Sequence, residues 1–195
     1  MVTASFSHPV LSAQSTFRAI LDAMARPGRV LAVRADVSPP PPLSPAGAAV
    51  ALTLCDHDTP VWLAADLRAS AAVGEWLRFH CGCDLVDDPA AAAFALASAA
   101  DLPGFDEFNI GTPDYPDRST TIVLQVQSLS SGTTLALTGP GIRDRSALQA
   151  EPLPPAMAER LAVNRRLFPC GIDLLLVAPT AVAALPRSVR VTEEG

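Results

Sequence analysis

The sequence contains no lysine: all fourteen basic residues among its 195 positions are arginines. A pyridoxal-phosphate enzyme needs a lysine amine to form its Schiff base. A P-loop needs a lysine directly after its second glycine to reach the phosphates. The absence of lysine therefore excludes both chemistries in their usual form.

Charge of either sign is also scarce. Charged residues make up 17% of the chain, and the net charge is −6. An acidic chain argues against nucleic acid or an anionic membrane as the main partner. Hydrophobic residues reach 49%, which with so little charge predicts a large apolar share of the surface, as in a subunit of an assembly. The length fits a single domain over residues 1–195.

Targeting and cross-linking signals are missing as well. No apolar run approaches the length that crosses a membrane, and residues 1–8 lack the basic and apolar regions of a secretory signal. Four cysteines in a chain of this size do not form a disulfide framework. We therefore expect a cytoplasmic protein.

Helical periodicity and capping residues predict four helices. Ser12 can cap the first, which ends before Pro27 because a proline ring disfavours helix in the preceding residue. Ser44 can cap a second helix, Asp66 can cap a third, and residues 155–167 form the fourth. The core stripes would comprise Phe17, Ile20, Leu21 and Met24 in the first helix and Val73, Trp76 and Leu77 in the third.

Short apolar runs between these helices predict strands. The run 172–177 is apolar on both faces apart from Asp173, which is typical of a parallel strand buried on both sides. Residues 120–127 and 133–138 alternate with period two around a Ser/Gly connector, and this predicts an antiparallel hairpin. The mixture of strands and helices predicts an α/β fold with three layers around a mixed sheet. Further strands are expected over 29–34, 61–64, 84–86, 92–97 and 181–185, although the alanines of 92–97 would also suit a helix.

The first candidate site is a metal centre. Cys55, His57, His80, Cys81 and Cys83 could offer thiolate and imidazole ligands to Zn²⁺. Neither Cys-x-His nor His-Cys-x-Cys matches the usual zinc knuckle, and the two groups lie on separate elements. We favour the alternative in which these are small buried thiols and turn histidines.

The second candidate is a nucleophile, in which Cys55 or Cys170 would pair with His57. An ordinary buried cysteine is the simpler interpretation of both thiols. The aromatic residues Trp62, Trp76 and Phe79 are likewise expected in the core rather than on a ligand platform.

The third candidate is an anion site. Gly139 and Gly141 flank Pro140, and their backbone N–H groups could act with Arg143 and Arg145 on an oxyanion. The segment is short and lacks a GxGxxG or GK[ST] pattern. The alternative that we prefer is a turn that ends a strand beside solvated arginines.

Seven stretches in order along the chain resemble the H subunit of bacterial carbon–phosphorus lyase systems, which break down phosphonates. One of them, residues 52–63, reads Leu-Thr-Leu-Cys-Asp-His-Asp-Thr-Pro-Val-Trp-Leu. Each stretch is weak alone, but the ordered set is specific and spans nearly the whole chain. The others are residues 17–28, 77–80, 124–130, 135–142, 168–175 and 185–187.

The resemblance implies a fold like the large domain of pyridoxal-phosphate-dependent transferases, without the cofactor. It implies a homodimer that works with the G, I and J subunits. It also implies the family's reaction, in which an alkylphosphonate displaces adenine from ATP and gives a ribose 1-alkylphosphonate 5-triphosphate. The family has no defined catalytic residues in this subunit to carry over, and its radical step and iron–sulfur cluster belong to the J subunit. The family pattern holds other residue types at Cys55, His57 and Cys170, which weakens the metal and nucleophile interpretations.

We therefore predict an accessory subunit of a phosphonate-processing complex, and we assign no catalytic, cofactor-binding or metal-binding residues to it. One alternative is a free-standing enzyme that uses a cysteine or an arginine-lined anion pocket. Another is a binding protein for a small nucleotide or phosphonate ligand.

Overall fold

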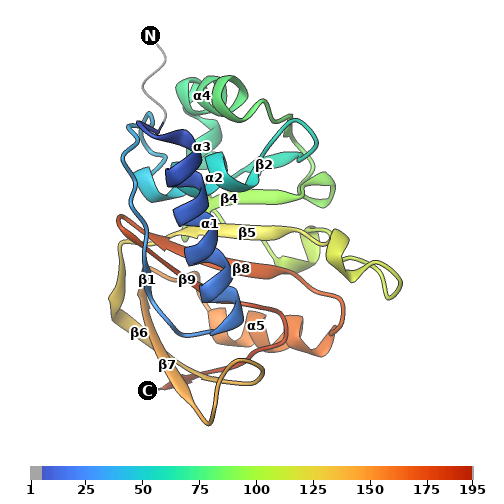
Figure 1. Ribbon diagram of the computed structural model, residues 1–195. Coiled ribbons are helices and arrows are strands. Elements are labelled where there is room, and N and C mark those ends of the chain that lie inside the picture. Colours follow the sequence, from blue (N-terminus) through green and yellow to red (C-terminus); the bar gives the residue numbers. More distant parts are fainter. Residues whose placement is uncertain (1–5, 195) are drawn as a thin grey trace.

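Residues 6–194 are described by a computed structural model, in which helices cover a central sheet (Figure 1). Its strands are β1 (Leu31–Ala32), β2 (Val61–Leu63), β3 (Leu85–Val86), β4 (Phe94–Ser98), β5 (Thr121–Gln125), β8 (Asp173–Ala178) and β9 (Ala181–Leu185). They lie in the order β1-β9-β8-β5-β4-β2-β3. The five strands from β8 to β3 run parallel, and β9 is antiparallel to both of its neighbours. The predicted mixed sheet is confirmed.

The helices begin and end largely where the local chemistry of the sequence predicts. The Ser44 hydroxyl caps the second helix by accepting a hydrogen bond from the Gly47 N–H at 3.0 Å. The first helix starts before Ser12, because Pro9 already suits the first helical turn. The third predicted helix is divided in two near Ser70. The helices are α1 (Pro9–Ala25), α2 (Pro45–Leu54), α3 (Ala65–Arg68), α4 (Ala71–Cys81) and α5 (Met157–Arg166), with 3₁₀ turns at Pro89–Ala91, Phe105–Glu107 and Pro116–Arg118.

A second, antiparallel sheet has the order β10-β6-β7, made of β6 (Ser128–Thr138), β7 (Ser146–Glu151) and β10 (Arg190–Glu194). This sheet corrects the hairpin predicted for residues 120–138. β5 pairs in parallel with β4 and β8, whereas β6 pairs with β7 and β10. Period-two patterning tells which side chains share a face, but it does not tell which strand lies alongside. β7 and β10 were not predicted.

Side chains alternate across the large sheet and create one core on each face. Ile122 and Leu124 of β5 pack with α5 and the small sheet. Val123, between them, packs with α1, α2 and α4. The three layers are therefore helices, large sheet, and a layer formed jointly by the small sheet and α5 (Figure 1).

Several predicted core residues lie on the surface instead. Phe17 and Leu21 of α1 are 44% and 50% exposed, and Phe79 of α4 is 70% exposed. Trp62 and Trp76 are buried as predicted. Between residues 6 and 194, no helix is long and apolar enough to cross a membrane.

Candidate functional site

Three of the candidate metal ligands, Cys55, Cys81 and Cys83, lie near one another where α2 and α4 end. Burial raises the pKa of the Cys55 thiol, and the neighbouring Cys83 and Asp56 add to this effect. A hydrogen bond with Cys83, together with burial, raises the pKa of Cys81. The thiolate is the form that binds metals and attacks electrophiles, so at neutral pH these two thiols are held in the unreactive form.

The histidines do not complete a site with these thiols. The His57 side chain is 80% exposed, and its Nε2 lies 3.4 Å from Oδ2 of the adjacent Asp58. His80 packs against Trp76, with the ring centroids 4.6 Å apart. Cys170 is buried just before β8. Within the described part of the chain, no three His, Cys, Asp or Glu residues are grouped so that they could hold a metal ion.

The glycines of the candidate anion loop have a structural role. Gly141 has a φ of +81°, and a Cβ there would lie 2.2 Å from the carbonyl oxygen of Ala25 at the end of α1. Only glycine permits this close approach together with that backbone angle. The Arg143 side chain is 98% exposed, with Nε 4.0 Å from Oδ2 of Asp144. The loop thus connects β6 to β7, and its arginines lie in solvent.

An ion pair that the sequence did not reveal ties three segments together. Nη2 of Arg187 donates to Oδ2 of Asp173 at 2.6 Å, and Nε donates to Oδ1 at 3.1 Å. The two side chains are only 13% and 15% exposed. Arg187 also donates to the Pro116 carbonyl oxygen at 2.6 Å and to the Ser119 hydroxyl. These bonds fix the start of β8 against the end of β9 and the turn before β5.

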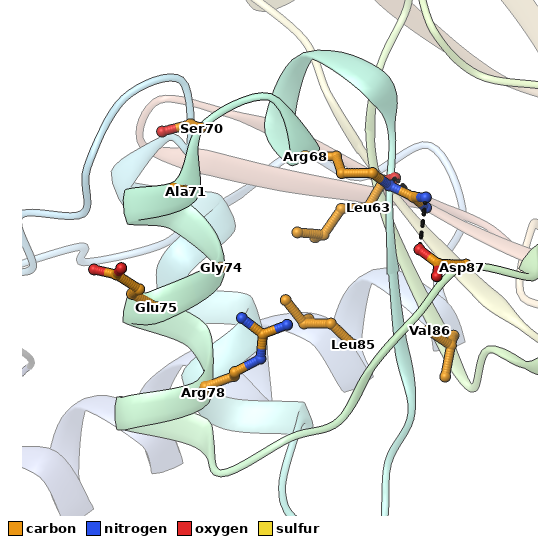
Figure 2. Close-up of a pocket in the computed structure, with 10 residues that line it drawn as sticks. All are labelled: Leu63, Arg68, Ser70, Ala71, Gly74, Glu75, Arg78, Leu85, Val86 and Asp87. Carbon is orange, nitrogen blue, oxygen red and sulfur yellow. Dashed lines mark hydrogen bonds and ion pairs between the residues drawn. The ribbon is translucent and has the colours of Figure 1, made fainter.

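A pocket of about 280 Å³ lies between α4, the residues around α3, and the edge strand β3 (Figure 2). Arg78 lines it from α4, and its Nη1 would be 3.5 Å from a Cβ placed on Gly74. Leu85 of β3 lies on the opposite wall, 3.3 Å from the same Cβ position. Gly74 therefore lets the Leu85 and Arg78 side chains lie close to the helix backbone.

Arg68 lines the same pocket from the end of α3. Its Nη1 donates to Oδ1 of Asp87 at 2.9 Å, and its Nε and Nη2 donate to the carbonyl oxygen of Leu63 at 3.3 and 3.2 Å. Its guanidinium carbon also lies 5.7 Å from the centre of the Trp62 ring. No sequence motif marks this pocket. Arg68 and Arg78 line the same pocket because the chain breaks between α3 and α4.

Exposed apolar side chains also gather on two of the described helices, α1 and α5. The first, which we call the α1 surface, consists of Val10, Phe17 and Leu21, which are 81%, 44% and 50% exposed. Their spacing of seven and four residues places them on one face of α1, next to the face that carries the buried Ile20 and Ala23.

The second, which we call the α5 surface, consists of Val163, Leu167 and Phe168 at the end of α5. It adjoins a groove of about 340 Å³ between α5 and the Gly104–Asp106 segment. The α1 and α5 surfaces lie on opposite faces of the large sheet (Figure 1).

Comparison with known proteins places the chain among phosphonate-related proteins. A family model described as "Bacterial phosphonate metabolism protein (PhnH)" matches residues 4–192. Alpha-D-ribose 1-methylphosphonate 5-triphosphate synthase subunit PhnH of Rhizobium meliloti (strain 1021) is 46% identical over 193 residues, 97% of this chain and 95% of that protein. The putative C-P lyase subunit protein HtxG of Stutzerimonas stutzeri is 29% identical over 182 residues, 93% and 87% of the two chains. These matches confirm the resemblance drawn from the sequence.

Proposed function

Because the chain belongs to the family of bacterial phosphonate metabolism proteins, we propose that it is a subunit of a carbon–phosphorus lyase complex in organic phosphonate catabolism. With its sister subunits it would serve the transfer of the ribose triphosphate moiety of ATP to an alkylphosphonate, with release of adenine. The observation that carries this proposal is the match to a synthase subunit over nearly the full length of both chains.

We propose further that the role is accessory, and that no residue of this chain supplies a catalytic group, a cofactor ligand or a metal ligand to that reaction. The support comes from the cysteines, whose thiols are mostly buried, and from His57, which lies in solvent beside Asp58. The same observations give no support to the alternative of a free-standing cysteine enzyme, since a nucleophile must be both ionised and accessible.

For the homodimer, we propose that the α1 surface is the contact between two copies. A two-fold contact places the same patch of each copy against itself, so a neutral patch suits it. The stripe itself is uncharged. Beside it Asp22 forms an ion pair with Arg26, and Arg18 adds one positive charge.

The α5 surface is better suited to a different chain. α5 carries Arg160, Arg165 and Arg166 but a single glutamate. Asp106 and Glu107 lie near Arg160 and offset its charge, so the excess positive charge lies on Arg165 and Arg166 at the end of the helix. An acidic partner would be attracted there, whereas a second copy would not. We therefore propose that it contacts sister subunits, with G, I and J as the candidates.

Three further features of the chain belong to this proposal. We propose that residues 1–195 act as one domain, that the protein works in the cytoplasm, and that its fold is that of the large domain of pyridoxal-phosphate-dependent transferases without the cofactor. The seven-stranded mixed sheet and the absence of lysine support the last of these. Superposition of an experimental structure on such a transferase would test it.

Genetics and copurification test the functional proposal. Deleting the gene should abolish growth on methylphosphonate as the sole phosphorus source, and a plasmid copy should restore it. A tagged chain should copurify with the products of neighbouring genes, in a complex whose mass accounts for two copies. Normal growth of the deletion strain would overturn the assignment.

A further inference from the structure

We propose that the pocket between α4 and β3 binds a phosphorus oxyanion, with the triphosphate of a nucleotide as the preferred ligand, and that Arg68 and Arg78 hold it. The proposal rests on the proposed function for the choice between phosphorus ligands, but the site itself follows from the geometry of the described residues. It gives this subunit a substrate-binding role without a catalytic one.

Arg78 is the pocket cation that can turn to a ligand, although, beside the hydrogen bond with Cys81, its charge also helps to lower the pKa of the Cys83 thiol. Among the hydrogen bonds and ion pairs of residues 6–194, none engages its guanidinium, which lies beside Gly74 and faces Leu85 (Figure 2). Glu75 also lines the pocket, but its carboxylate is directed away from Leu85 and Arg68 (Figure 2). A cation without a carboxylate partner, next to an apolar wall, attracts an anion more strongly than the same cation in open water.

Arg68 adds a second cation, of whose five N–H groups three are engaged, by Asp87 and by the Leu63 carbonyl oxygen. Its partner Asp87 has a side chain that is 99% exposed, so their ion pair is screened by water and contributes little. A bound oxyanion can therefore share the guanidinium of Arg68 with Asp87. The hydrogen bonds from Arg68 to the Leu63 carbonyl oxygen keep the side chain at the rim of the pocket.

The start of α4 provides further donors at the other end of the pocket. Ser70 and Ala71 line the pocket, and the Ser70 side chain does not cap the helix, because its hydroxyl donates to the Pro41 carbonyl oxygen at 3.1 Å. First-turn N–H groups and the helix dipole favour an anion at such a place. From Ala71 to Arg78 the helix rises by about 10 Å.

This length favours a triphosphate over a single phosphonate group. A linear triphosphate can reach both the start of α4 and Arg78, whereas one phosphonate group meets only one end. The lining also carries two carboxylates, Glu75 and Asp87, so the site depends on where its charges point and not on their sum.

The test is a calorimetric titration of the purified chain with inorganic tripolyphosphate at low salt. We expect wild type to bind, and Arg78→Leu to bind about 10- to 100-fold more weakly, which corresponds to one lost charge-assisted contact. Arg29→Leu is the matched control, because it removes the same charge from an exposed position outside the pocket. It should bind as wild type does. If Arg78→Leu fails to fold by circular dichroism, Arg78→Gln, which keeps most of the side chain, replaces it.

Competition against tripolyphosphate shows whether the pocket takes the triphosphate of a nucleotide or a phosphonate. Displacement of tripolyphosphate by ATP but not by methylphosphonate supports the triphosphate assignment. Displacement by methylphosphonate alone keeps the oxyanion site but assigns it to the phosphonate. Absence of tripolyphosphate binding at millimolar concentration, or equal binding by the Arg78 and Arg29 variants, overturns the proposal. Copurification with sister subunits is scored separately, so a failure here is distinct from a failure of the proposed function.

Discussion

Replacing Arg187 by leucine tests which contacts hold the end of the large sheet together. The arginine connects the start of β8, the end of β9 and the turn before β5 through its bonds to Asp173, Pro116 and Ser119. Leucine fills part of the volume but donates nothing. The Asp173 carboxylate, 15% exposed, would then be left with the backbone N–H of residue 187 as its remaining donor from this network.

The cost can be estimated from the burial of the pair. Removing one partner of a buried ion pair typically costs about 3–5 kcal/mol, because the other charge stays desolvated and unpaired. In a domain of this size that loss lowers the melting temperature by about 6–20 °C. Replacing Asp173 by asparagine at the same time removes the stranded charge. The double variant should therefore be more stable than Arg187→Leu alone.

Urea unfolding at fixed protein concentration, followed by the fluorescence of Trp62 and Trp76, measures these differences. Arg166→Leu serves as the control, since that arginine is exposed and should change the unfolding free energy by less than about 0.5 kcal/mol. The reasoning fails if Arg187→Leu loses less than about 1 kcal/mol, or if the double-variant cycle gives a coupling energy near zero.

Three further predictions concern the α1 surface, a glycine turn and a buried thiol. Phe17→Glu should convert the proposed dimer to a monomer by light scattering, because it places a charge in an apolar contact, while Phe79→Glu on α4 should leave the mass unchanged. Gly141→Ala should lose about 2 kcal/mol or more in urea unfolding, whereas Gly82→Ala, with φ +71° but no atom within 4 Å of the new Cβ, should lose about 1 kcal/mol. Burial raises the pKa of Cys55 in the folded chain, so above about pH 8.5, the ordinary pKa of a thiol, the unfolded chain loses this proton first and the stability should fall as pH rises. Cys55→Ala should make that decline shallower.

The sequence predicts best where one residue's chemistry decides the structure. Ser44 and Pro45 determine where α2 begins, and the run 172–177, apolar apart from Asp173, predicts a strand buried on both faces, which the structure has as β8. Strand pairing depends on contacts between distant segments. For that reason the same pattern that identifies β5 and β6 as strands does not separate them into two sheets.

The pocket of Arg68 and Arg78 was missed for a related reason. Gly74 and Arg78 are four residues apart, so their proximity on α4 follows from helical spacing. The position of Arg68 does not, because the sequence predicts a single helix from Asp66 onward. The break near Ser70 creates a second helix start and turns Arg68 toward the pocket, and nothing in the local sequence signals that break strongly.

The prediction that Phe17 and Leu21 of α1 lie in the core was wrong, and the reason is informative. Its pattern correctly identifies an amphipathic helix, but apolar residues occur on more than one face: Ile20 faces the core while Phe17 and Leu21 face outward. A wide apolar stripe arises when a helix must bury one side in its own fold and another side in a second chain. The apolar pattern of the sequence is the same whether a side chain is buried in its own fold or against a second chain, so the pattern cannot distinguish the two. The excess of apolar residues over what the monomer's core uses is thus itself an argument that α1 contacts another chain, and the Phe17 variant measures whether it does.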